Sequence, residues 1–194
     1  MAERWYRLAL VGDPLNQGDV ILQCPVLNWE PGPLEVNAPG MTTEMLRQRI
    51  HPRQADVVVM TQACDLEHDK VRNVVLCPHW SLSDFKRTWE EDQLSRKQNP
   101  TAKAWRNYCD DIRDGYVWHL NMLNAEDVDG VKIEQRVVDF HDVFAIPREM
   151  LESLLRHRNE PRPQLLPPYR EHLSQAFARF FMRVGLPTNV STAW

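Results

Sequence analysis

The residues of this chain whose types and spacing could do chemistry lie between positions 62 and 79. Cys64 and Asp65 follow the apolar run DVVVMTQ (56–62) after one alanine, and Cys77 ends a second run, VRNVVLC (71–77), with His79 two residues later. Cysteine and histidine are ligands that zinc prefers, and a cysteine beside a histidine can be a nucleophile. The stretch therefore raises three hypotheses: half of a metal site, a catalytic site, or a turn that only supports the fold.

The geometry of the two runs argues against a zinc site. Their connection, residues 63–70, is too short for a parallel crossover, so the runs should form an antiparallel hairpin. Cys64 would then lie at the loop end, with Cys77 about six residues down the second strand and on the order of 20 Å away. Zinc needs ligands about 2.0–2.3 Å from one point. We therefore predict no metal site that uses both cysteines, and no cofactor.

A cysteine nucleophile needs a lowered thiol pKa, supplied by a base, a cation or a helix N-terminus. Acidic neighbours at 65, 67 and 69 work in the opposite direction. The structural alternative has Cys64 buried and Asp65 accepting backbone N–H groups, as an Asx turn or the cap of a short helical turn. We favour this structural interpretation, and a binding role for the loop without chemistry stays open. If the protein is an enzyme, the candidate catalytic residues are Cys64, Asp65, His79 and Arg53.

The charge of the chain bears on its partners. The net charge is −4 and the pI is near 6.0, whereas nucleic-acid binders usually have a basic surface because phosphate neutralisation dominates their affinity. Basic residues do accumulate in the last third, at Arg156, Arg158, Arg162, Arg170, Arg179 and Arg183, with His157 and His172. A solvated helix face is the ordinary explanation of such a series. The candidate binding residues are Arg170, Arg179, Arg183 and, in the 63–70 loop, His68.

Segments of strand type and helix type alternate along the chain. We expect a short helix at 42–50, a pair of helices over 81–114, a turn at NAEDVDG (124–130), and an extended loop at 28–40. A helix should run from Pro147 to Arg158. The last helix should follow the linker PRPQLLPPY and end at Gly185 and Pro187, with at least two of Phe177, Phe180 and Phe181 packed in the core. Strands are expected at 20–26, 56–62, 71–77, 116–123, 131–140 and 142–147.

The chain length favours a single α+β domain. Its β core would take residues 17–80 and 116–146, with helices inserted at 81–114 and C-terminal helices at 147–185. The chain holds no run of about 18 apolar residues, so neither a membrane span nor a membrane partner is expected. The N-terminal stretch lacks the features of a signal peptide. Four irregularly spaced cysteines favour a reduced, cytoplasmic protein.

Three segments, GDVILQCPV, DVVVMTQ and NVVLCPHWS, resemble in their order the strands of the PemK/MazF family. The resemblance covers residues 17–82 and implies a small SH3-like β-barrel and a ribonuclease activity. The Arg-Pro that the family carries ahead of its second strand is not reproduced, with His51-Pro52-Arg53 only nearby. The Thr-Ser of the family corresponds to Trp80-Ser81, so tryptophan replaces the threonine. The CDL sequence after the strand and the ending PPYREHLSQAFARFFMRVGLP also resemble a group of bacterial proteins, which implies no activity.

Two classes of function are compatible with these residues. The favoured one is a non-catalytic accessory protein of bacterial type that binds a protein partner, less readily a nucleic acid, with a defence or toxin–antitoxin role as one context. The alternative is a PemK/MazF-like endoribonuclease or another hydrolase that uses residues near Cys64 and Asp65.

Overall fold

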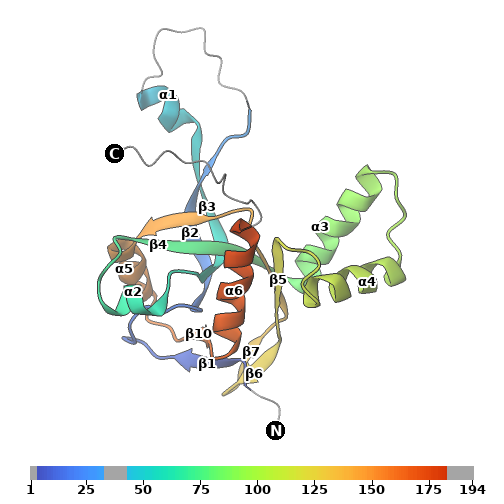
Figure 1. Cartoon of the computed structure of the whole chain (residues 1–194). Coiled ribbons are helices and arrows are strands. Elements are labelled where there is room, and N and C mark those ends of the chain that lie inside the picture. The colour runs from blue at the N-terminus through green and yellow to red at the C-terminus, as the bar shows by residue number, and fades with distance from the viewer. Residues whose placement is uncertain (1–3, 33–42, 183–194) are drawn as a thin grey trace, which may run out of the picture. The chain divides into compact units, whose positions relative to one another are not determined.

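The part of the chain that the computed structural model describes, residues 4–32 and 43–182, contains six helices and ten strands (Figure 1). The helices are α1 (Thr43–Gln48), α2 (Ala63–Glu67), α3 (Leu82–Ser95), α4 (Ala102–Arg113), α5 (Arg148–Arg158) and α6 (Tyr169–Phe181). The strands are β1 (Tyr6–Ala9), β2 (Val20–Trp29), β3 (Ile50–Val59), β4 (Asn73–Ser81), β5 (Leu120–Leu123), β6 (Glu126–Val128), β7 (Val131–Ile133), β8 (Arg136–Asp139), β9 (Phe144–Pro147) and β10 (Arg162–Leu165). The predicted α+β class is confirmed.

Two compact units divide the chain. The β unit is made of residues 7–79 and 142–164, and the hairpin unit of residues 1–6, 80–141 and 165–194. Neither unit is continuous in sequence, because the segment 80–141 interrupts the β unit.

The β unit is built on antiparallel strands. β2 pairs with β3, β3 with β4, and β4 with β9. The register of β3 and β4 sets Val58 opposite Cys77, so the predicted antiparallel hairpin is confirmed. Alternate residues of the apolar runs of both strands face one core, which α2 and α5 also cover. That core consists of Leu15, Ile21, Cys24, Val26, Val57, Val59, Leu66, Val74, Leu76, Ile146 and Leu151.

The strands of the described residues form open sheets and no closed barrel. β2 lies at the edge of its sheet, and its register shifts between Ile21 and Cys24, where Gln23 adopts a φ of 48°. At this bulge the Arg158 guanidinium donates to the carbonyl oxygens of Leu22 and Gln23. A side chain therefore occupies backbone groups at the edge of the sheet, and bulges commonly protect an edge in this way.

The hairpin unit begins with the two helices expected over 81–114. Ser81 and Thr101 cap them, accepting from the backbone N–H of Asp84 and Ala104 at 3.0 and 3.1 Å. Facing aromatic rings join α3 to α4, and the base of the pair packs on β5 and β8 around Ile112. The rings are those of Phe85, Trp89, Trp105 and Tyr108.

The segment between α4 and β9 departs from the expected pattern. β5 is four residues long, not eight, and the predicted turn at 124–130 contains β6. The tight turn is confined to Asp129-Gly130, both of which have positive φ, as two-residue hairpin turns require. The expected strand 131–140 is divided into β7 and β8 because β7 pairs back onto β6 while β8 pairs with β5.

The C-terminal elements include one that was not expected. α5 follows Pro147 as predicted, but the linker PRPQLLPPY contains β10, which pairs with β1. In α6, Phe177 and Phe180 pack against Phe140 with ring centroids 5.5 and 6.2 Å apart. Phe181 is 57% exposed, whereas Phe177 and Phe180 are half-buried and pack within the hairpin unit. The expected end of this helix at Gly185 and Pro187 lies outside the described residues, as does most of the loop expected at 28–40, whose first two residues belong to β2.

Candidate binding pocket

The sequence-predicted site begins at α2, and its cysteine is not where the favoured interpretation had it. Cys64 is exposed, so the prediction of a buried thiol is wrong. The side chain that α2 buries is Leu66, two positions on, because a five-residue helix can turn only one face to the core. The loop residue His68 is exposed as well.

Asp65 does not hold the turn by capping it. It lies inside α2, whose N-cap is Gln62, and the Asp65 carboxylate is instead 3.8 Å from Lys70 Nζ. The strand end is held by Thr61, whose hydroxyl accepts from the backbone N–H of Val75 at 2.7 Å.

The four candidate catalytic residues do not gather at one point. Arg53 lies in β3, six residues before its end, with its guanidinium 5.4 Å from the ring centroid of Phe144. Cys64 lies five residues beyond that end, and His79 is buried within β4. At roughly 3.3 Å per strand residue, Arg53 and Cys64 are at opposite ends of β3.

The basic series of the last third does not form one surface. Arg162 is buried. Arg170 donates to Glu171, and the Arg179 guanidinium lies 5.0 Å from the ring centroid of Trp118. Arg183 lies outside the described residues.

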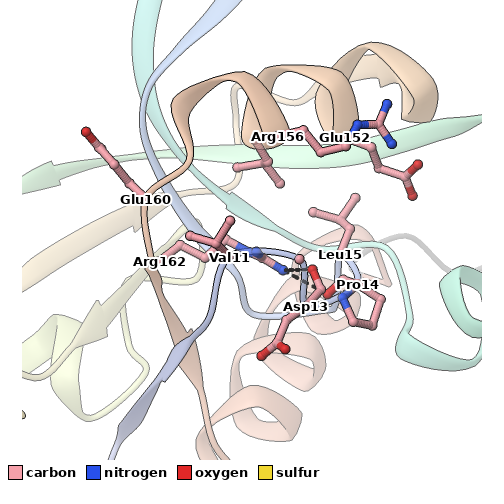
Figure 2. A pocket seen from close by; sticks show the side chains of 10 residues that line it. Val11, Asp13, Pro14, Leu15, Glu152, Arg156, Glu160 and Arg162 are labelled. Atoms are coloured by element: carbon pink, nitrogen blue, oxygen red, sulfur yellow. Dashed lines mark hydrogen bonds between the residues drawn. The ribbon is translucent and has the colours of Figure 1, made fainter.

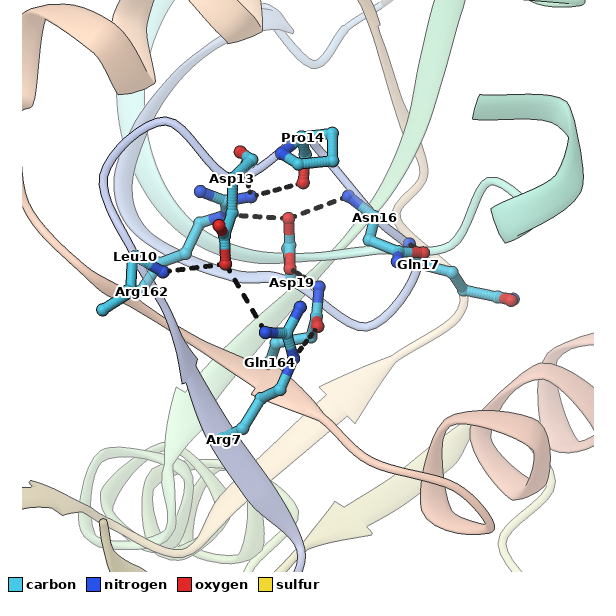
Figure 3. A network of polar contacts seen from close by, with 9 residues as sticks. All are labelled: Arg7, Leu10, Asp13, Pro14, Asn16, Gln17, Asp19, Arg162 and Gln164. Atoms are coloured by element: carbon cyan, nitrogen blue, oxygen red, sulfur yellow. Dashed lines mark hydrogen bonds and ion pairs between the residues drawn. The ribbon is translucent and has the colours of Figure 1, made fainter. Parts of the chain in front are cut away.

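Arg162 belongs to a buried polar network that connects three segments of the β unit (Figure 3). Its Nε donates to Asp19 Oδ2 at 2.7 Å, and Gln164 Nε2 donates to the other carboxylate oxygen at 2.6 Å. The backbone N–H of Asn16 donates to Asp19 Oδ2 at 2.9 Å. Asp19 is fully buried, and a buried carboxylate is tolerated when a cation and hydrogen-bond donors surround it in this way.

The same guanidinium fixes the loop that precedes β2. Arg162 Nη2 donates to the carbonyl oxygens of Asp13 and Pro14 at 3.1 and 2.8 Å. Burial raises the pKa of Asp19, and the attraction of Arg162 opposes that shift. Residues 13–19 are thus held by a charge that β10 supplies.

A rigid turn, Leu10 to Asp13, precedes this loop. Asp13 donates its backbone N–H to the Leu10 carbonyl at 3.0 Å, and the Asp13 carboxylate accepts from the Leu10 N–H at 3.0 Å. Gly12 takes a φ of +93°, which side-chain-bearing residues rarely adopt. Leu10 and Val11 are nevertheless 64% and 49% exposed. The turn therefore presents two apolar side chains to solvent in a fixed conformation.

Beside this turn the β unit has a pocket of about 240 Å³, bounded by α5 and by residues 11–15 (Figure 2). The lining combines apolar and charged side chains. The apolar ones are Val11, Pro14, Leu15 and Leu155, and the charged ones are Asp13, Glu152, Arg156, Glu160 and Arg162. The sequence gives no direct signal for this pocket, because its parts come from segments about 140 positions apart.

The described residues contain no cluster of three or more histidine, cysteine or acidic side chains that could hold a metal ion. No described helix is long and apolar enough to cross a membrane. Comparison of the chain with protein-family models, with curated proteins and with solved structures found no match.

Proposed function

We propose that this protein is a non-catalytic binding protein that engages a protein partner through the Leu10–Asp13 turn and the adjoining pocket. The observation that carries the proposal is the exposure of Leu10 and Val11 on a turn that hydrogen bonds hold on both sides. An apolar pair fixed in one conformation buries surface on binding with little loss of conformational entropy.

Other features of the described residues favour a protein over a nucleic acid as the partner. The net charge is −4, and the candidate phosphate ligands Arg170 and Arg179 are already engaged by Glu171 and Trp118. A hydrolase is not proposed, because Arg53, Cys64 and His79 are spread along β3, α2 and β4. The four free cysteines support a reducing compartment, the cytoplasm.

The likeness to PemK/MazF proteins has one support, the strand order. The three matching segments correspond to β2, β3 and β4, which are neighbours in that order. We propose a distant structural relation on that basis, without the ribonuclease activity.

The proposal is tested by comparing what the protein captures from a lysate of its source cells before and after the turn is made polar. Leu10→Ser with Val11→Ser should abolish the capture of one or more proteins that the wild type retains. Leu94→Ser is the matched control, because Leu94 is 61% exposed on α3. A captured set that the double variant leaves unchanged would show that the turn is not the contact surface.

A further inference from the structure

The geometry points to a carboxylate, the C-terminal carboxylate of the partner's chain, as the group that the pocket between α5 and residues 11–15 receives. This inference rests on the proposed function, since it names the part of the partner that enters the site.

The donor for that carboxylate is the remaining end of the Arg162 guanidinium. Nε and Nη2 are used by Asp19, Asp13 and Pro14. Nη1 donates to none of the described residues and is not among the buried atoms that lack a partner, and 7% of the Arg162 side chain is exposed. Arg162 lines the pocket, and its other bonds hold it in place. A guanidinium fixed before binding offers N–H donors to a carboxylate with little reorganisation.

Arg156 supplies a second positive charge at the same pocket. It is exposed and has no ion-pair partner among the residues that the structure describes. Two of the acidic lining groups are already matched: Glu152 accepts from Arg148 at 2.7 Å, and Asp13 lies 3.4 Å from Arg7. Glu160 is the lining carboxylate without a described partner, and it is exposed to solvent, where its repulsion is screened.

The apolar lining indicates which group the carboxylate comes from. It favours a chain terminus over the side chain of an aspartate or glutamate. A C-terminal residue carries its side chain and its carboxylate on the same Cα, so it needs a cation and an apolar surface within one small pocket. Arg162 and Arg156 are the cations, and Val11, Leu15 and Leu155 are the surface. A volume of about 240 Å³ is below the roughly 300–1,000 Å³ of pockets for drug-sized ligands, which suits a single terminal residue.

The experiment uses short peptides and the full chain, with the methyl resonances of Leu15 and Leu155 as the readout. An acetylated tripeptide that ends in leucine with a free carboxylate should shift these methyls with a Kd on the order of 1 mM. Its C-terminal amide should bind at least about tenfold more weakly, because the charge-assisted hydrogen bonds are lost. An acetylated and amidated peptide with a central aspartate should bind as weakly as the amide. Its binding as tightly as the free acid would overturn the terminus as the source.

Two surface variants decide the sign of the recognised charge, and neither touches the buried network. Arg156→Gln should weaken the binding of the free-acid tripeptide several-fold, whereas Glu160→Gln should leave the affinity for this peptide equal or higher. The opposite pattern, together with binding of a tripeptide that has a free N-terminal amine, would overturn the inference in favour of amine capture.

The absence of any shift at about 10 mM free acid would also overturn it. If that result came together with loss of lysate capture in Leu10→Ser with Val11→Ser, the turn would remain the partner surface and only the carboxylate would be wrong. If the tripeptide bound while capture was unchanged, the carboxylate site would stand without the proposed function.

Discussion

The buried Asp19 carboxylate depends on the positive charge of Arg162. Asp19→Ala should lower the free energy of unfolding by about 3–5 kcal/mol, because Arg162 would be left buried without its counterion. Asp19→Leu combined with Arg162→Met should recover most of that loss, since an apolar pair carries no desolvation cost. Urea denaturation of the three proteins gives the comparison. A change below about 1 kcal/mol for Asp19→Ala would mean that water reaches the network.

The cysteines should differ sharply in reactivity. Burial raises the pKa of the Cys24 thiol to about 11, whereas Cys64 is exposed. A thiol reagent at pH 8 should therefore modify Cys64 in the native protein and reach Cys24 and Cys77 only on unfolding. Peptide mass spectrometry over time measures both rates. Equal labelling of Cys24 and Cys64 would contradict the burial of β2.

The same thiol gives stability a dependence on pH. Unfolded Cys24 ionises near its ordinary pKa of 9.0 and the folded residue near 11. The raised pKa means that its contribution to stability is complete below pH 9 and is lost as the pH rises through 11. Cys24→Ala should flatten this alkaline decline in a series of thermal melts, which tests the assignment.

At the scale of the element, α6 depends on two rings. Phe177→Ala should destabilise the protein by about 2 kcal/mol, less than for a fully buried phenylalanine because Phe177 is only half-buried. Phe181→Ala, in the same helix and 57% exposed, should cost less than about 1 kcal/mol. Thermal unfolding of the two variants makes the comparison, and equal losses would mean that Phe181 packs in solution.

The elements that could be predicted from the sequence are those with enough residues to show a period. Long apolar patterns mark four elements, β3, β4, α5 and α6. A hairpin and a helix are both formed by residues that are close in sequence, so these patterns can be interpreted locally. β6, β7 and β10 are three or four residues long, and no period is visible over that length. β10 also follows Pro161 and contains Pro163, and prolines favour a loop. Exposure of Cys64 could not be predicted either, because the facing side of a five-residue helix depends on the core beneath it.

The pocket is the least predictable feature, for a different physical reason. Gly18-Asp19 has the composition of a turn, and nothing near it indicates that its carboxylate is buried. The residue that pairs with Asp19 is Arg162, which in sequence is one arginine of a basic series. The β-bridge between Asp19 and Gln164 makes Asp19 and Arg162 neighbours.

At the scale of the whole molecule, each unit has its own core, and a matched pair of substitutions should separate them. Leu151→Ala lies in the β unit and Leu173→Ala in the hairpin unit, and both leucines are buried. Each should cost about 2–5 kcal/mol. Each should speed amide hydrogen exchange mainly within its own unit, residues 50–79 for the first and 81–139 for the second. Equal acceleration in both segments would mean that the chain unfolds as one cooperative body.

The bond between Asp19 and Arg162 joins residues 143 positions apart. A ribosome that adds roughly 5–20 residues per second needs about 7–30 s to cover that span. Throughout this time the nascent aspartate has no counterion, so it must stay hydrated and the loop before β2 must stay open. The pocket is accordingly completed after most of the polypeptide has been synthesised, and a message truncated before codon 162 yields a product in which the pocket never forms.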